Sequence, residues 1–293
     1  MKRWRSMFPR RVWIRVMRKD RILKEINEIA PLIQEFRSIV ATTELEEGAQ
    51  FTVVDLCCGY GYLSMFLSEM LPADKVSRFV LVDKQWPMRD HETLPHHINP
   101  DHLNLPGVWK TRMHTRKVNI KKASEVRQLH EYVFSQANGP VLVSAVHLCG
   151  TLSIKAIGMF NTHPNLAAMV LKPCCLPGKQ HAKNDEVWTV GQHTFAARDV
   201  YHRSNDNKGH IKFRQWTNHL YEGFDIEGRY KMLEFIHVQP HHCQNLYIFV
   251  RRPHPLPGCV PPPKPLLTRV QTIHLALAAG YLAAVYSKLR AGL

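Results

Sequence analysis

Two acidic residues and two glycines form the first group whose types and spacing could do chemistry. The segment VVDLCCGYGYLS places Asp55 at the end of an apolar run and follows it with Gly59 and Gly61. Glycines in such a turn let backbone amides approach a ligand without a Cβ in the way. Asp83 ends the next apolar run, where a carboxylate can accept hydrogen bonds from both ribose hydroxyls of an adenosine. The G-Y-G spacing argues against a dinucleotide fingerprint, and an ordinary strand–turn–helix remains the alternative.

Histidine, lysine and cysteines form a second group, in the segments HLCG and KPCC, with His147, Cys149, Lys172, Cys174 and Cys175. In one interpretation His147 or Lys172 orients or deprotonates a nucleophile, and the cysteines shape the floor of the pocket. In others the cysteines bind a metal, pack beneath a tight turn, or attack C6 of a pyrimidine. The adjacent cysteines lack the C-x₂-C spacing of structural zinc sites, so we expect no metal.

Alternating strands and helices must position these residues. Apolar runs predict five strands, at 51–56, 79–82, 117–120, 140–146 and 167–171. Helical spacing marks 21–40, 63–71 and 123–135, and we expect the first of these helices to serve packing only. Runs at 231–238 and 245–251 are separated so briefly that they must pair antiparallel. This order predicts an α/β fold with a mostly parallel sheet covered on both faces.

The motifs resemble those of a known family. DLCCGYGYLS is similar to the first motif of class I methyltransferases, and VLVDK to their second. HLCG and KPCC narrow the resemblance to the family that includes the tRNA 2′-O-methylase of the acceptor stem, over about residues 51–250. The resemblance implies a class I (Rossmann-like) fold with a seven-stranded sheet and an antiparallel terminal hairpin. It also implies S-adenosyl-L-methionine as the cofactor.

The resemblance also implies roles for individual residues. It places the methionine part of the cofactor against Asp55, Cys57, Gly59 and Gly61. The ribose would be held by Asp83, and the adenine would lie near Asn119, where many relatives have aspartate. The sequence lacks the amino-terminal cysteine–histidine zinc module that the tRNA enzyme has. The resemblance therefore suggests tRNA without fixing it as the substrate.

Positive charge points to a polyanionic partner. The 293 residues carry a formal net charge of +15, and the sequence pI is about 9.6. Six basic residues stand without an acid between 110 and 122. We expect RNA, either tRNA or rRNA, as the substrate, although a soluble protein can also be merely basic. The alternative is an inactive methyltransferase-like RNA-binding scaffold or assembly factor within a ribonucleoprotein.

Composition divides the chain into three parts: a basic arm and helix at 1–45, a methyltransferase domain at 46–252, and a proline-rich linker with a helix at 253–293. Residues 1–19 contain arginines but no acid, which suits a mitochondrial targeting helix or an arm on nucleic acid phosphates. We expect a mitochondrial location, with the cytoplasm or nucleus as alternatives. The seven cysteines favour a reducing compartment. The apolar run in 267–289 is too short for a membrane span, so we expect no transmembrane segment.

Overall fold

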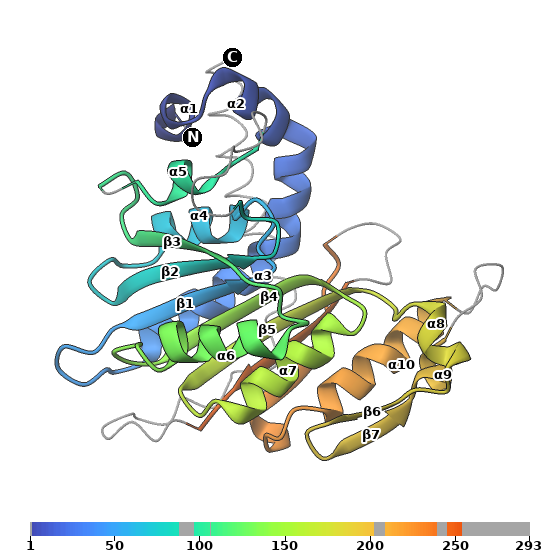
Figure 1. Cartoon of the computed structure of the whole chain (residues 1–293). Helices are drawn as coiled ribbons and strands as arrows, with labels where there is room; N and C mark the ends of the chain where they lie inside the picture. The colour runs from blue at the N-terminus through green and yellow to red at the C-terminus, as the bar shows by residue number, and fades with distance from the viewer. Residues whose placement is uncertain (1, 88–96, 106, 202–208, 239–244, 254–293) are drawn as a thin grey trace.

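The computed structural model describes residues 2–87, 97–105, 107–201, 209–238 and 245–253 (Figure 1). The helix expected in 267–289 and the turn QPHHCQ lie outside these ranges. Among the described helices, none combines the length and the apolar character needed to cross a bilayer.

A seven-stranded sheet forms the centre of the molecule, in the order β3-β2-β1-β4-β5-β9-β8. The first five strands pair in parallel, whereas β9 runs antiparallel to both β5 and β8. The sheet thus confirms the predicted class I methyltransferase architecture. The strands are β1 (Phe51–Leu56), β2 (Val76–Asp83), β3 (Arg112–Lys117), β4 (Val141–Cys149), β5 (Leu166–Cys175), β8 (Lys231–Phe235) and β9 (Leu246–Arg251).

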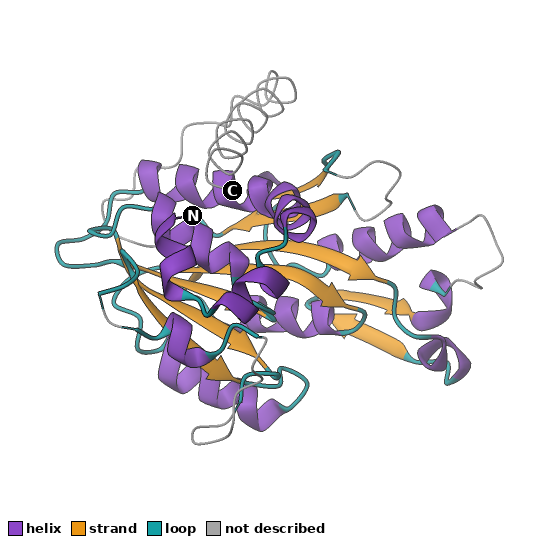
Figure 2. Ribbon diagram, turned by 90° about the horizontal axis from the view of Figure 1, so that it is seen from above, coloured by secondary structure: helices purple, strands orange, loops and turns teal. Residues whose placement is uncertain are grey.

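Helices cover both faces of the sheet (Figure 2). Alternate side chains of a strand point to opposite faces, so Val53 and Val54 of β1 enter two different hydrophobic clusters. One cluster includes α3 (Lys19–Thr42), α4 (Tyr62–Met70) and the short helix α5 (Pro100–Leu103). The other includes α6 (Ala123–Leu129), the π-helical turn η1 (His130–Phe134), α7 (Leu152–Thr162) and α10 (Gly209–Glu222).

The amino-terminal residues form two short helices, α1 (Lys2–Met7) and α2 (Arg10–Val16), that pack onto the first of these clusters. Trp4 is buried, with its ring centroid 5.1 Å from that of Phe66 and 5.7 Å from that of Trp109. The hydroxyl of Tyr62 in α4 donates a hydrogen bond to the carbonyl of Val16. The arginines of this segment remain exposed. The segment is therefore amphipathic, with its apolar face already covered by the domain.

Two predicted elements differ clearly from those in the structure. The third strand was expected at 117–120, but β3 occupies Arg112–Lys117, so that prediction is wrong. Val118 and Ile120 are buried as an apolar run should be, yet they lie in the loop after the strand. The helix expected at 123–135 changes from α6 to η1 at His130. The polar region after β5 contains α8 (Lys179–Lys183), the hairpin β6 (Val187–Val190) with β7 (His193–Ala196), and α9 (Ala197–Val200) before α10.

Candidate functional site

The glycine loop joins the end of β1 to the start of α4. Gly59 and Gly61 have φ angles of 56° and 76°, a region that glycine adopts without strain. Gly61 is the N-cap of α4, and a Cβ there would clash with the Leu81 side chain. Among the described residues, and apart from its two chain neighbours, no atom lies within 4 Å of the position that a Cβ would take at Gly59. The loop therefore presents an uncovered backbone at the carboxyl end of β1.

Asp83 ties this loop to the end of β2. Its Oδ2 accepts a hydrogen bond from the Gly59 amide at 3.1 Å, and its Oδ1 accepts one from the Gln85 amide at 2.8 Å. The residue is 8% exposed. A carboxylate offers about four acceptor positions, so two amide donors leave capacity for a ligand hydroxyl.

Asp55 lies deeper in the protein than Asp83. Its two oxygens accept hydrogen bonds from the hydroxyls of Ser64 in α4 and Ser144 in β4, both at 2.9 Å. Burial raises the pKa of Asp55 to about 6, against the opposing effect of these hydroxyls. Asp55 therefore joins the loop helix to the neighbouring strand.

A buried ion-pair network lies at the carboxyl ends of β4 and β5. His147 Nε2 is 2.6 Å from Glu28 Oε2, and Lys172 Nζ is 3.9 Å from Glu28 Oε1. The side chains of Glu28 and Lys172 are 3% and 1% exposed, whereas that of His147 is 36% exposed. Burial alone would raise the pKa of Glu28, but the His147 hydrogen bond and the Lys172 ammonium lower it overall. Only His147 of these three reaches toward solvent.

The structure brings three cysteines together beside His147. Cys149 Sγ lies 3.0 Å from Cys174 Sγ, which is 3.5 Å from Cys175 Sγ. The hydrogen bond from Cys174 lowers the pKa of Cys149 to about 6, and the same pairing raises the pKa of Cys174. Cys57, in the glycine loop, interacts electrostatically with Asp83, Asp55 and Cys149, and burial raises its pKa to about 12. The loop and the cysteines therefore share one region.

One more predicted position, Asn119, belongs to this edge of the sheet. Asn119 follows β3. Its backbone amide donates to the Glu125 carboxylate at 2.6 Å, and its side-chain Oδ1 accepts from the backbone amide of Lys121 at 3.1 Å. The preceding amide, of Val118, donates to the carbonyl of Asp83. Trp86, three residues after Asp83, is 4% exposed, and its indole Nε1 donates to the carbonyl of Leu81, so it belongs to the core.

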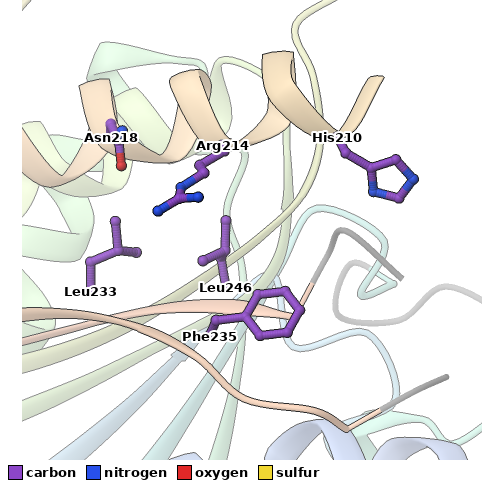
Figure 3. A pocket seen from close by; sticks show the side chains of 6 residues that line it. All are labelled: His210, Arg214, Asn218, Leu233, Phe235 and Leu246. Carbon is purple, nitrogen blue, oxygen red and sulfur yellow. The ribbon is translucent and has the colours of Figure 1, made fainter. Parts of the chain in front are cut away.

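A cavity of about 340 Å³ lies between α10 and the terminal hairpin (Figure 3). Polar side chains from the helix face apolar side chains from β8 and β9 across it. Leu246, at the start of β9, is near the carboxyl end of β5, because the antiparallel register pairs Leu171 with Ile248. The lining residues are His210, Arg214, Asn218, Leu233, Phe235 and Leu246.

Glu28 is a site residue that the sequence pattern did not reveal. Helix α3 was expected to serve packing only, yet its Glu28 reaches both His147 and Lys172. Its spacing could have revealed it: Glu28 stands four residues before the buried Leu32 and eight before the buried Phe36, so it lies on the apolar face of the helix. Ser64 and Ser144, which hold Asp55, were also missed.

Comparison with known proteins identifies the domain. A family profile described as a methyltransferase domain matches residues 21–178, which run from α3 to just beyond KPCC. No protein of curated function matches the sequence significantly. Solved structures include a cyclopropane-fatty-acyl-phospholipid synthase-like protein from Lactobacillus casei, with a TM-score of 0.31 and 12% identity over 52% of this chain and 50% of that one. They also include an O-methyltransferase family protein from Burkholderia thailandensis, with a TM-score of 0.34 and 13% identity over 86% of this chain and 66% of that one.

This chain therefore spans about half and two thirds of the lengths of those two proteins. Likenesses at such TM-scores carry no argument about activity. The family profile, by contrast, matches more than half of the sequence and includes the glycine loop, Asp83 and Glu28. The chain belongs to the methyltransferase domain family.

Proposed function

We propose that this methyltransferase uses S-adenosyl-L-methionine, bound at the glycine loop, to methylate RNA. The observation that carries the cofactor assignment is the hydrogen bond between the Gly59 amide and Asp83. This hydrogen bond joins the glycine loop after β1 to the end of β2. It holds the uncovered backbone at Gly59 next to the Asp83 carboxylate, which can accept further hydrogen bonds. The loop would receive the methionine part of the cofactor and Asp83 the ribose hydroxyls.

His147 would orient the nucleophile. Methyl transfer is a displacement at a sulfonium carbon, so much of the catalysis comes from positioning. Glu28 holds one ring nitrogen of His147, and the ring is partly exposed at the carboxyl end of β4, where ligands of open α/β folds gather. Lys172 is buried and its ammonium group lies near the Glu28 carboxylate. It would therefore help to position Glu28 and His147 and would not contact the substrate itself.

Exposed basic side chains support RNA as the substrate. Arg112, Arg116 and Lys117 are exposed on β3, which lies at one edge of the sheet. The arginines of α1 and α2 add to this charge, and Arg214 lines the cavity near β5. Such side chains can neutralise phosphates along an extended polyanion. A scaffold role would use the same charge, but it has no need for a ribose carboxylate.

Isothermal calorimetry tests the cofactor assignment. We expect S-adenosyl-L-methionine to bind with micromolar affinity, worth about 8 kcal/mol. Asp83→Ala should weaken binding at least about tenfold, because the ribose hydroxyls lose a charged acceptor. Asp74→Ala, at an exposed acid before β2, is the matched control and should bind like wild type. Absence of binding by wild type at millimolar cofactor would leave the inactive scaffold as the better interpretation.

A further inference from the structure

Three cysteine sulfurs converge at the carboxyl ends of β4 and β5. The sulfurs of Cys149, Cys174 and Cys175 all lie within 4.8 Å of one another. Cys149 and Cys175 are exposed, whereas Cys174 is buried. The shortest sulfur–sulfur distance, 3.0 Å between Cys149 and Cys174, is well above the roughly 2.05 Å of a disulfide. The cluster therefore consists of free thiols with two members open to solvent.

The backbone brings these cysteines together in a way that their spacing does not suggest. Cys149 pairs with Cys175 across the β4–β5 ladder, and the register shifts on both sides of Leu148. His147 has a φ of 60°, a left-handed conformation that interrupts the alternation of β4. Adjacent residues of a regular strand point to opposite faces, yet the sulfurs of Cys174 and Cys175 approach to 3.5 Å where β5 ends.

We propose that Cys149, Cys174 and Cys175 form a binding site for one thiophilic metal ion, for which Zn²⁺ is the natural candidate. Zinc–thiolate bonds of about 2.3 Å in a tetrahedron place the sulfurs about 3.8 Å apart. The observed distances of 3.0 and 3.5 Å require outward movements of less than about 1 Å, which small side-chain rotations provide. The exposed side of the cluster leaves a fourth position for water or a substrate atom.

The sequence predicts no metal site because Cys174 and Cys175 are adjacent and lack the C-x₂-C spacing of structural zinc ligands. The register of the sheet supplies the third sulfur from the neighbouring strand, so the spacing rule does not apply. Zinc with three thiolates carries one net negative charge. Lys172, two residues before Cys174 in β5, interacts electrostatically with Cys174 as well as with Glu28, so its ammonium group can balance part of that charge. Bound metal would join the ends of β4 and β5 next to His147.

The site is tested with the full-length chain, purified under reducing conditions, incubated with ZnCl₂ and freed of excess metal. Elemental analysis should find about one equivalent of zinc per chain. Substitution with Co²⁺ should give the near-ultraviolet sulfur-to-cobalt charge-transfer absorption of thiolate ligands. This readout is independent of methyl transfer and of cofactor binding, so it separates this proposal from the proposed function.

Cys149→Ser is the decisive variant, because an exposed residue can be changed with little effect on folding. It should lose the zinc and the cobalt band while keeping the wild-type melting temperature of the metal-free protein. Cys58→Ser, at a cysteine of the glycine loop outside the cluster, is the matched control and should keep both. Less than about a tenth of an equivalent in wild type, or zinc retained by Cys149→Ser, would overturn the proposal.

Discussion

At the scale of single residues, Asp55 is sensitive to pH in a range where most aspartates are fully ionised. Its pKa is raised from 3.8 to about 6 by burial. The folded state therefore holds this proton more tightly than the unfolded state does. The resulting stabilisation is present below the unfolded pKa and is lost as pH rises through about 6.

We predict that lowering the pH from about 7 to 5 stabilises wild type relative to Asp55→Asn by on the order of 1 kcal/mol. Other titrating groups cancel in this comparison, because both proteins share them. Urea unfolding at the two pH values measures the difference. Asp74→Asn is the control, since its exposed carboxylate should follow wild type at both pH values. An equal difference for Asp55→Asn at both pH values would contradict the prediction.

Glu28 permits a second test at this scale. Glu28→Gln removes the charge that holds His147 and leaves Lys172 buried without its partner. We predict that kcat for methyl transfer to RNA falls on the order of a hundredfold, because the nucleophile is no longer oriented. The affinity for cofactor should remain that of wild type.

The control is Glu35→Gln on the same helix, which disrupts an ion pair with Arg251 instead. It should leave kcat unchanged. Melting temperatures of both variants separate a local effect from loss of folded protein. A parallel loss of kcat and cofactor binding in Glu28→Gln would show that the network is structural only.

At the scale of elements, the sequence predicts what is buried better than what is exposed. It places β1 at the residues that the strand occupies, because both faces of β1 are apolar and pack against helices. It misplaces β3, because that strand lies at an edge and carries exposed arginines and a lysine in place of an apolar run. The glycine loop was predicted because its two glycines follow Asp55 closely in the sequence and because Asp55 and Asp83 each stand near the end of an apolar run.

The remaining part of the site depends on contacts between distant segments. Glu28 meets His147 only because α3 packs across the sheet, and Cys149 meets Cys174 only through the ladder of β4 and β5. Sequence spacing carries no information about such distances. The register shifts around Leu148 add a local irregularity that no hydrophobic period encodes.

The helices α1 and α2 lead to a prediction about stability. Trp4 is 3% exposed, and its rings contact Phe66 and Trp109. Trp4→Ala should lower the free energy of unfolding by about 3 kcal/mol, through lost burial and the remaining cavity. Urea denaturation measures this. Arg10→Ala, at an exposed position of the same segment, should change it by less than about 0.5 kcal/mol. If Trp4→Ala were as stable as wild type, the segment would not be part of the folded core.

At the scale of the whole molecule, the net charge of +15 leads to a prediction about the proposed RNA substrate: its affinity should depend steeply on ionic strength. With about six phosphate contacts, affinity should fall on the order of a thousandfold between roughly 50 and 200 mM salt. The double variant Arg112→Glu and Arg116→Glu should weaken binding to every RNA about equally, because phosphate contacts carry no sequence information. Fluorescence anisotropy with tRNA and rRNA fragments measures both effects.

The matched control is Arg37→Glu with Lys155→Glu, which changes net charge equally at exposed positions on α3 and α7. It should bind more tightly than the β3 double variant. Competition with heparin tests whether the basic surface prefers RNA to other polyanions. If heparin displaces structured RNA at physiological salt, the charge is a general polyanion surface and RNA is not the substrate.

The position of β3 at the end of the sheet has a consequence for solubility as well. A strand at the end of a sheet presents unpaired amides and carbonyls, which can template pairing with another molecule and begin aggregation. On β3 the Asn104 side chain accepts a hydrogen bond from the Thr115 amide at 2.9 Å and so covers part of this edge. The exposed Arg112, Arg116 and Lys117 would repel a second copy of the same edge. The same cations would thus act as gatekeepers against self-association. If RNA binds these cations as proposed, removing them would weaken that binding and also remove this protection, so colloidal stability and RNA affinity should fall together.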